Sequence, residues 1–185
     1  MSTAVIDSLE ETTQVALPVS AQLKLAFRFH PGGVAVITAK SPLGNAALTA
    51  TSVTSVSAEP PLLAFSVSAL SSSAQKIRSA DHVVVHLLDA EGLDVARLGA
   101  TSGIDRFADT SLWREHAEGD PIFHDARAWL RCKIVERVDA SGSTLYLAEV
   151  VETSMPYGDD QGEPADGLVY ANRNWHRISE ASRVQ

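Results

Sequence analysis

Hydroxyl side chains crowd one stretch of the sequence, from Leu48 to Ser57. Six of these ten residues are Ser or Thr, and the others are small or β-branched apart from Leu48. β-Branched residues favour strands, so we expect an extended segment that a flat polar ligand can approach closely. A Thr-rich strand with no ligand is the alternative, and the composition of this stretch alone does not separate the two.

A second group with chemical potential follows in Ser71–Ser73, which precedes a short helix predicted over residues 73–79. Ser72 or Ser73 would cap this helix, and Lys76 lies within it. Hydroxyls, the N–H groups of a helix start and a nearby ammonium suit a phosphate group. Together the two stretches favour a cradle for a flat ring with an anionic tail.

Other catalytic centres have little support. His82 and His86 lie four apart on one strand face with no carboxylate at ligand spacing, so we assign no metal. Cys132 lies in a strand pattern and is interpreted as a small buried residue, although Arg131 and Lys133 could lower its pKa. The sequence has no G-x-G-x-x-G, Walker A or G-x-S-x-G motif, and we assign no catalytic side chain.

The composition excludes several classes of partner. The 185 residues favour one domain, and the formal net charge of −8 with no basic patch argues against nucleic acid and against an anionic membrane surface. The single cysteine rules out an intrachain disulfide, no apolar run is long enough to span a membrane, and the acidic N-terminus is not a signal peptide. We expect a cytoplasmic protein.

The elements that would position these groups are mostly strands. Residues 1–18 are interpreted as a flexible N-terminal tail and residues 19–180 as the domain. Ser20 is the expected cap of a first helix, with Leu23 and Phe27 on its apolar face. Loops dominate residues 100–126, anchored by Trp113 and Phe123. A second helix is expected over residues 90–99, and strands over residues 34–38, 46–51, 62–67, 83–88, 128–138, 144–153, 168–170 and 174–178.

This order contains no βαβ repeat with long helices, which argues against a doubly wound parallel sheet. Consecutive strands are joined mostly by hairpins, and Ser41–Asn45 and Asp139–Gly142 are the clearest turns. A closed antiparallel barrel with a few short helices is the fold class that we expect, because closure removes exposed strand edges.

Several segments taken together resemble the flavin reductase-like family, over roughly residues 22–178. The resemblance rests on FRFHPGGVAVITA, ALTATSVTSVSAEPPLLAFSV, SSSAQKI and HVVVHLL, with weaker support from residues 105–107, residues 129–135 and the closing LVYANRNWHRI. It implies an antiparallel Greek-key split β-barrel that binds FMN or FAD, usually as a homodimer with the flavin near the subunit interface. It also implies an NADH- or NADPH-dependent flavin reductase that supplies a flavin-dependent monooxygenase.

The resemblance implies three groups of flavin contacts. Those to the ring and ribityl chain are Asn45, Ala47, Leu48, Thr49, Thr51 and Ser52. Those flanking the ribityl chain and phosphate are Ser66, Val67 and Ser68. Those at the phosphate are Ser72, Ser73 and Lys76.

The chain also departs from the family pattern. Many members carry Gly-Asp-His beside the nicotinamide, where this sequence has Gly142, Ser143 and Thr144, and glycines of the pattern are replaced by Ala47 and Ala148. Thr144 and Arg106 are therefore the candidate contacts for the nicotinamide donor.

Two other hypotheses stay open, the first of them because the histidine is missing. One is a flavin-binding carrier or sensor protein without reductase turnover. The other, ranked third, is a flavin enzyme that acts directly on an organic substrate, with the loop at residues 157–167 shaping its pocket.

Overall fold

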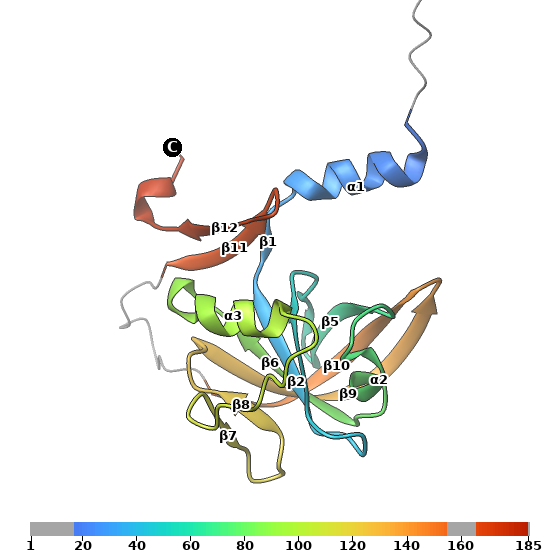
Figure 1. The fold of residues 1–185 in the computed structure, drawn as a ribbon, viewed down its shortest axis with the longest axis vertical. Helices are drawn as coiled ribbons and strands as arrows, with labels where there is room; N and C mark the ends of the chain where they lie inside the picture. The colour runs from blue at the N-terminus through green and yellow to red at the C-terminus, as the bar shows by residue number, and fades with distance from the viewer. Residues whose placement is uncertain (1–16, 155–165, 185) are drawn as a thin grey trace, which may run out of the picture.

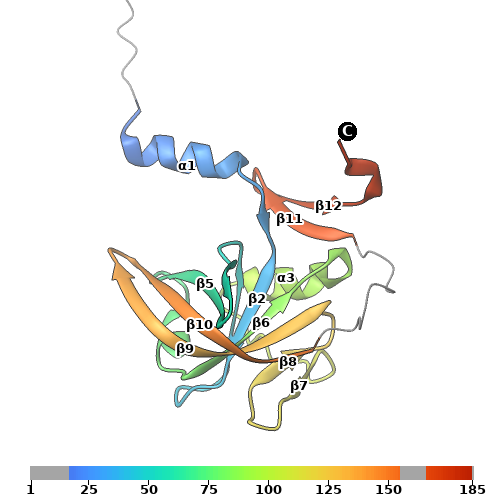
Figure 2. The same ribbon diagram turned by 180° about the vertical axis from the view of Figure 1, so that it is seen from behind.

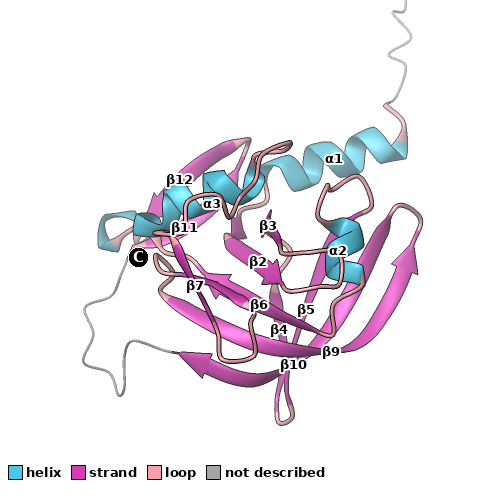
Figure 3. Cartoon of the chain, turned by 60° about the horizontal axis from the view of Figure 1, so that its bottom comes forward, coloured by secondary structure: helices cyan, strands magenta, loops and turns pink. Residues whose placement is uncertain are grey.

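A single curled sheet forms the body of the protein. The computed structural model describes residues 17–154 and 166–184. Within them, seven antiparallel strands curl into a barrel that does not fully close (Figures 1 and 3). In spatial order these are β3 (Ala46–Ala50), β2 (Ala35–Ala39), β6 (His82–Leu87), β9 (Ala128–Ala140), β10 (Ser143–Ser154), β5 (Pro61–Ser68) and β4 (Thr54–Ala58).

Strands β2 and β6 are buried on both faces. All five residues of β2 are buried, because the barrel interior covers one face and a helix with its adjoining loops covers the other. Inside the barrel, the rings of Phe65 and Tyr146 stack with their centroids 4.9 Å apart. Outside it, Val36 packs with Val95 and Phe123 in a second apolar cluster. β-Branched residues fill these positions because both sides of the strand are dry.

Short elements surround the barrel. The helices of the described residues are α1 (Val19–Phe29), α2 (Ala74–Arg78) and α3 (Leu93–Ala100), with single turns η1 (Ala90–Gly92) and η2 (Glu180–Ser182). A small sheet joins β1 (Gly32–Gly33), β11 (Gly167–Ala171) and β12 (Asn174–Ile178), and a hairpin joins β7 (Trp113–Glu115) to β8 (Pro121–Phe123). None of these helices is long and apolar enough to cross a membrane.

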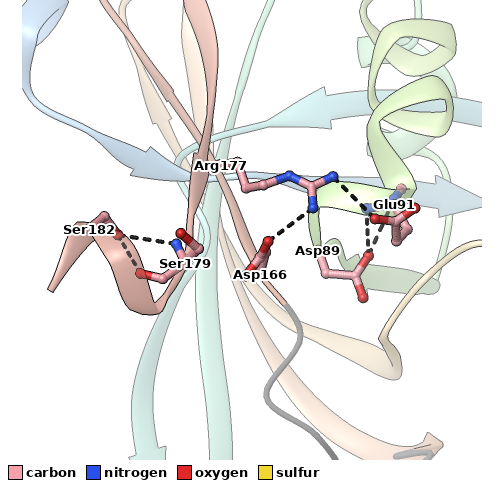
Figure 4. A network of polar contacts seen from close by, with 7 residues as sticks. Asp89, Glu91, Asp166, Arg177, Ser179 and Ser182 are labelled. Carbon is pink, nitrogen blue, oxygen red and sulfur yellow. Dashed lines mark hydrogen bonds and ion pairs between the residues drawn. The ribbon is translucent and has the colours of Figure 1, made fainter.

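Ion pairs fasten the C-terminal hairpin to the start of α3 (Figure 4). The guanidinium of Arg177 on β12 donates to Asp166 at 2.9 Å and to Glu91 of η1 at 3.1 Å. The carboxylate of Asp89 accepts hydrogen bonds from the backbone N–H groups of Glu91 and Gly92, which caps the same turn. The start of α3 is thereby held by side chains from distant parts of the chain.

The expected fold class is confirmed, as are all eight strands predicted from the sequence, within one or two residues at each end. Four strands were missed: β1, β4, β7 and β8. Ser20 was wrong as a helix cap, since Pro18 occupies that position and makes no side-chain cap bond. Leu23 and Phe27 do lie one turn apart on α1, but no residue of this helix is buried, and it projects from the barrel (Figures 1 and 2). Most of the expected tail, residues 1–16, lies outside the described residues.

Two polar or reactive side chains lie fully inside the protein. Cys132 on β9 is buried, and desolvation raises the pKa of its thiol to about 12. The role of a small buried residue is therefore confirmed, and its basic neighbours do not activate it. His86 on β6 is buried as well, and desolvation lowers its pKa to about 4.

His86 joins two layers of the structure as a neutral ring. Its Nε2 accepts a hydrogen bond from the N–H of Phe123 at 3.0 Å, so Nδ1 carries the proton and donates to the carbonyl of Val36 at 3.0 Å. Protonation would place a second N–H against the donor of Phe123.

We predict that the free energy of unfolding falls as the pH is lowered from about 6.5 to about 4. The folded-state pKa of His86 lies below the unfolded value, so its contribution is complete above pH 6.5 and is lost below it, by about 3 kcal/mol at most. Urea unfolding followed by tryptophan fluorescence measures this. A His86→Gln variant should show a flatter pH profile, and an equally steep one would contradict the assignment.

Candidate functional site

One edge of the barrel carries backbone groups that no neighbouring strand of the described residues pairs. β3 is an edge strand paired only with β2. The carbonyl of Ala47 accepts from the Ser73 hydroxyl at 2.7 Å, and that of Asn45 accepts from the Lys76 ammonium at 3.0 Å. In an antiparallel strand the N–H and C=O of one residue point to the same side. The peptide groups of Asn45, Ala47 and Thr49 therefore face away from β2.

The gap in the barrel lies between β3 and β5, and the Ser52 side chain bridges it. The Ser52 hydroxyl donates to the carbonyl of Ser66 at 3.2 Å and accepts from the N–H of the same residue at 3.0 Å. This contact lies just beyond the end of β3, and β3 and β5 do not form a ladder of backbone hydrogen bonds.

The first cavity, of about 560 Å³, lies at the start of β3. Its walls come from β3, from the turn and helix at Ser72 to Lys76, and from the loop that follows α3. The lining residues are Asn45, Ala46, Ala47, Ser72, Ser73, Lys76, Gly103, Ile104, Asp105, Arg106 and Phe107. The lining contains two cations, Lys76 and Arg106, and one carboxylate, Asp105. Oδ1 of Asp105 already accepts a hydrogen bond from the N–H of Phe107.

The second cavity, of about 330 Å³, has no lining residue in common with the first, but the two linings adjoin along the chain. Ala47 in the first cavity and Leu48 in the second are consecutive on β3, and Ser72 and Ser71 are consecutive in the turn. Its lining residues are Leu48, Thr49, Ala50, Thr51, Ser52, Ser66, Val67, Ser68, Ser71 and Ser143. The two cavities together lie in the size range of ligand sites.

The structure places all twelve residues that the resemblance assigned to flavin around these two cavities. Five line the first cavity and seven the second, from segments that are up to 31 residues apart in the sequence.

Several of the expected hydroxyls are already engaged within the protein. Thr49 donates to the carbonyl of Ala96 at 2.6 Å, Ser52 is bonded to Ser66, and Ser73 donates to Ala47. Among the described residues, four lining hydroxyls make no such bond and remain available to a ligand. These are Thr51, Ser66, Ser72 and Ser143.

The expected helix N-terminus contributes less than the sequence indicated. α2 has only five residues, and the Ser73 hydroxyl makes no cap bond to its first turn. Ser71 instead accepts the N–H of Ser73 within the preceding turn. The positive charge of the first cavity therefore comes from the side chains of Lys76 and Arg106.

The two candidate contacts for the nicotinamide donor do not lie together in one cavity. Arg106 lies in the first cavity, where its Nη1 donates to the Ser73 hydroxyl at 3.2 Å. The Thr144 hydroxyl donates to Asp139 at 2.9 Å and accepts from Arg78 at 3.1 Å, and Thr144 lines neither cavity. Its neighbour Ser143 lines the second cavity, because successive side chains of a strand point to opposite faces.

The Arg78–Asp139 pair, with Thr144, fastens α2 to the β9–β10 hairpin. Both guanidinium Nη atoms of Arg78 reach the carboxylate, at 2.6 and 2.9 Å. The hydrogen bonds from Arg78 and then Thr144 lower the pKa of Asp139 to about 2. This pair holds the serine turn against the barrel from outside the cavities.

Helix α3 packs against β3 on the outer face of the barrel. Gly99 lies so close to β3 that an added Cβ would stand 2.5 Å from the Thr49 hydroxyl and 3.1 Å from its backbone nitrogen. The loop carrying Arg106 leaves the end of this helix. A search of the described ranges finds no group of three or more His, Cys, Asp or Glu side chains arranged to hold a metal ion.

Comparisons with known proteins give a consistent result. Residues 27–179 match the family model described as flavin reductase like domain. The chain is 36% identical over 154 residues to the NADH:FMN oxidoreductase of Rhodococcus erythropolis, covering 83% of this chain and 79% of the relative. It is 32% identical over 148 residues to the 4-hydroxyphenylacetate 3-monooxygenase reductase component of Pseudomonas aeruginosa, covering 78% and 84%.

A solved structure of a flavin reductase domain protein from Arthrobacter sp. FB24 superposes with a TM-score of 0.78 at 31% identity. It covers 86% of this chain and 96% of the other. The fold described above is therefore one that is also seen in a crystal structure.

We predict that Gly99→Ala destabilises the protein by about 1–3 kcal/mol, because the new methyl group must push α3 away from the β3 edge. Thermal unfolding measures the loss. Gly33→Ala is the matched control, since nothing lies within 4 Å of the position that its methyl group would occupy. Equal melting temperatures for the two variants would contradict the close packing of α3 on β3.

Proposed function

The chain belongs to the flavin reductase-like family, and from that premise we propose that it is an NAD(P)H-dependent flavin reductase. In this proposal the nicotinamide donor is oxidised, FMN or FAD is reduced, and the reduced flavin serves a flavin-dependent monooxygenase. The monooxygenase partner is supported by the Pseudomonas relative, whose name identifies it as the reductase component of such a system. Residues 19–180 form the proposed flavin-binding domain, and a cytoplasmic location remains part of the proposal.

One observation carries the proposal: the linings of the two cavities adjoin at Ala47 and Leu48 on the open edge strand β3. Ala47 and Thr51 are four residues apart, about 13 Å along a strand. That length suits a ring system with a five-carbon chain and its terminal phosphate. The free hydroxyls of Thr51, Ser66 and Ser143 line the second cavity. The small residue Ala47 and the cations Lys76 and Arg106 line the first. The residues present therefore fit a phosphorylated flavin, with the ring in the second cavity.

Bound flavin supplies the redox chemistry itself, namely acceptance of a hydride from nicotinamide. The protein's own residues have to bind and orient two rings, which lowers the barrier by fixing their approach. In this proposal Thr51 and Ser66 would hydrogen-bond polar atoms of the ring edge, and the Asn45–Ala47 backbone would let the ribityl chain approach closely. No side chain of the site has to gain or lose a proton.

Ser143 is the residue that we propose beside the nicotinamide, in place of Thr144. Its side chain is half-buried and lines the second cavity, whereas the Thr144 hydroxyl is engaged with Asp139 and Arg78. A carrier or sensor protein without turnover is the second candidate, favoured by the absence of the family's histidine from this turn. The third hypothesis placed a substrate loop at residues 157–167, and all but the last two of these lie outside the described residues.

We expect the purified protein to oxidise NADH or NADPH only when FMN or FAD is present, followed as loss of nicotinamide absorbance. Comparing the two donors and the two flavins identifies the preferred pair. Flavin binding without oxidation of either donor would favour the carrier. An absence of both binding and oxidation would remove the proposal altogether.

A homodimer is also part of the proposal, supported by the surface of α1. Val19, Leu23 and Phe27 form a stripe along this helix and are 57–81% exposed in the single chain. Burying each such side chain is worth about 1.5–3 kcal/mol. The C-terminal end of α1 is anchored, where Arg28 bonds to Asn172. A second copy of the chain is the occupant that the family pattern implies for this stripe.

Leu23→Glu combined with Phe27→Glu should convert the dimer to monomers, because two charges would have to be buried at the interface. Light scattering coupled to size-exclusion chromatography reports the mass. Lys24→Glu, on the polar face of the same helix, is the control and should remain dimeric. A wild-type protein that elutes as a monomer would contradict the dimer.

A further inference from the structure

A third cavity, of about 190 Å³, lies beside the β7–β8 hairpin. Its walls come from this hairpin, from the chain that follows β8, and from the start of β9 and the end of β10, which pair through Trp129 and Ser154. It shares no lining residue with the two cavities described above. The stacked rings of Phe123, in this lining, and Phe107, in the lining of the first cavity, stand between the two sites with their centroids 5.8 Å apart. The proposed function gives this third cavity no role.

The buried part of its lining is apolar. Ile122 and Phe123 on β8 are each 1% exposed. Trp129 adds a partly buried indole ring, and His116 packs edge-on against that ring with the centroids 5.9 Å apart. The His116 ring is itself tied to Glu152 at 3.0 Å. A flat apolar group can therefore pack here against side chains whose orientation is already fixed.

The charge of the lining is positive. Arg114 and Arg127 belong to it, and no Asp or Glu of the described residues does. The guanidinium of Arg114 lies over the Trp129 ring, 5.9 Å from its centroid. In the described part of the chain this guanidinium makes no hydrogen bond or ion pair. Stacking on a ring leaves the N–H donors at the edge of a guanidinium open, so Arg114 is oriented and can still bind an anion.

The apolar part and the charged part together restrict the class of ligand. An inorganic anion would leave the apolar wall in contact with water, and a neutral ring would leave Arg114 without a partner. The volume lies below the range of about 300–1,000 Å³ that larger organic ligands occupy, which argues against a nucleotide. A carboxylate matches the fork of a guanidinium with two parallel hydrogen bonds. The lining therefore fits one aromatic ring that carries a carboxylate.

We propose that the third cavity binds a small aromatic carboxylate. The ring packs against Phe123 and Trp129, and the carboxylate accepts hydrogen bonds from Arg114. The hydroxyl of Ser154, which has no partner among the described residues, is a further donor in the same lining. This site goes beyond the proposed function and does not depend on it, because its residues line neither flavin cavity.

Benzoate is the probe for this site. In proton–nitrogen NMR correlation spectra of the full chain, benzoate should shift the indole N–H signal of Trp129 in a saturable way and leave that of Trp175 unchanged. In Arg114→Gln the dissociation constant for benzoate should rise about 10- to 100-fold, the loss typical of a charge-assisted hydrogen bond. The affinity of the same variant for FMN should equal that of the wild type, because Arg114 lies outside the flavin cavities.

Control variants and control ligands separate charge from shape. Arg97→Gln removes a charge from an exposed site on α3, where the guanidinium pairs with Asp94, and should bind benzoate as the wild type does. Arg114→Lys keeps the charge but loses the planar fork, so its affinity should fall between those of the wild type and Arg114→Gln. Benzyl alcohol lacks the charge and acetate lacks the ring, so each should bind at least about tenfold more weakly than benzoate.

Four results would overturn the inference. Displacement of benzoate by FMN would place the ligand in the flavin cavities, and equal benzoate affinity in the wild type and Arg114→Gln would remove the proposed contact. Tighter binding of inorganic phosphate than of benzoate would make this a site for inorganic anions. The absence of any saturable shift would remove the site. None of these measurements depends on flavin reduction, so this inference and the proposed function can fail separately.

Discussion

The site depends on one constraint, which is that the barrel stops short of closing between β3 and β5. A complete ladder would pair every outward peptide group of β3 with another strand, and no ligand could reach them. Here Ser52 bridges to β5 just beyond the end of β3, while Ser73 and Lys76 satisfy two carbonyls of the β3 edge from α2 and its turn. The residues of this edge line the two cavities, and we expect a bound molecule to take the place of a missing strand there.

Much of this arrangement could be predicted because it is encoded locally. Alternating strands with short turns indicated the antiparallel fold. The twelve flavin contacts implied by the resemblance lie in three short segments, in and beside β3, at the end of β5, and in the turn and helix at residues 72–76. Which hydroxyls are free could not be predicted, because that depends on contacts between distant segments. Thr49 is engaged by α3, 47 residues away, and Ser73 by β3, 26 residues away. Nothing in the spacing of TATS or SSS distinguishes these side chains from Thr51 or Ser72.

Other errors have similar causes. Two consecutive prolines, Pro60 and Pro61, stand where β4 turns into β5. They hid the tight turn in the sequence pattern, so β4 was not recognised as a separate strand within the hydroxyl-rich stretch. The sequence indicated the apolar face of α1 but not what covers it, and in the single chain that face is exposed to solvent. Arg106 is separated from Ser73 by 33 residues, and only the third dimension shows that the two share a hydrogen bond.

The buried thiol of Cys132 has a practical consequence. With its pKa raised to about 12 and no exposed surface, it stays protonated and out of reach of maleimides at neutral pH. Since the chain has no other cysteine, one introduced on the exposed face of α1 would be the sole reactive handle. Fluorophores or spin labels could then be attached there without first removing the native residue.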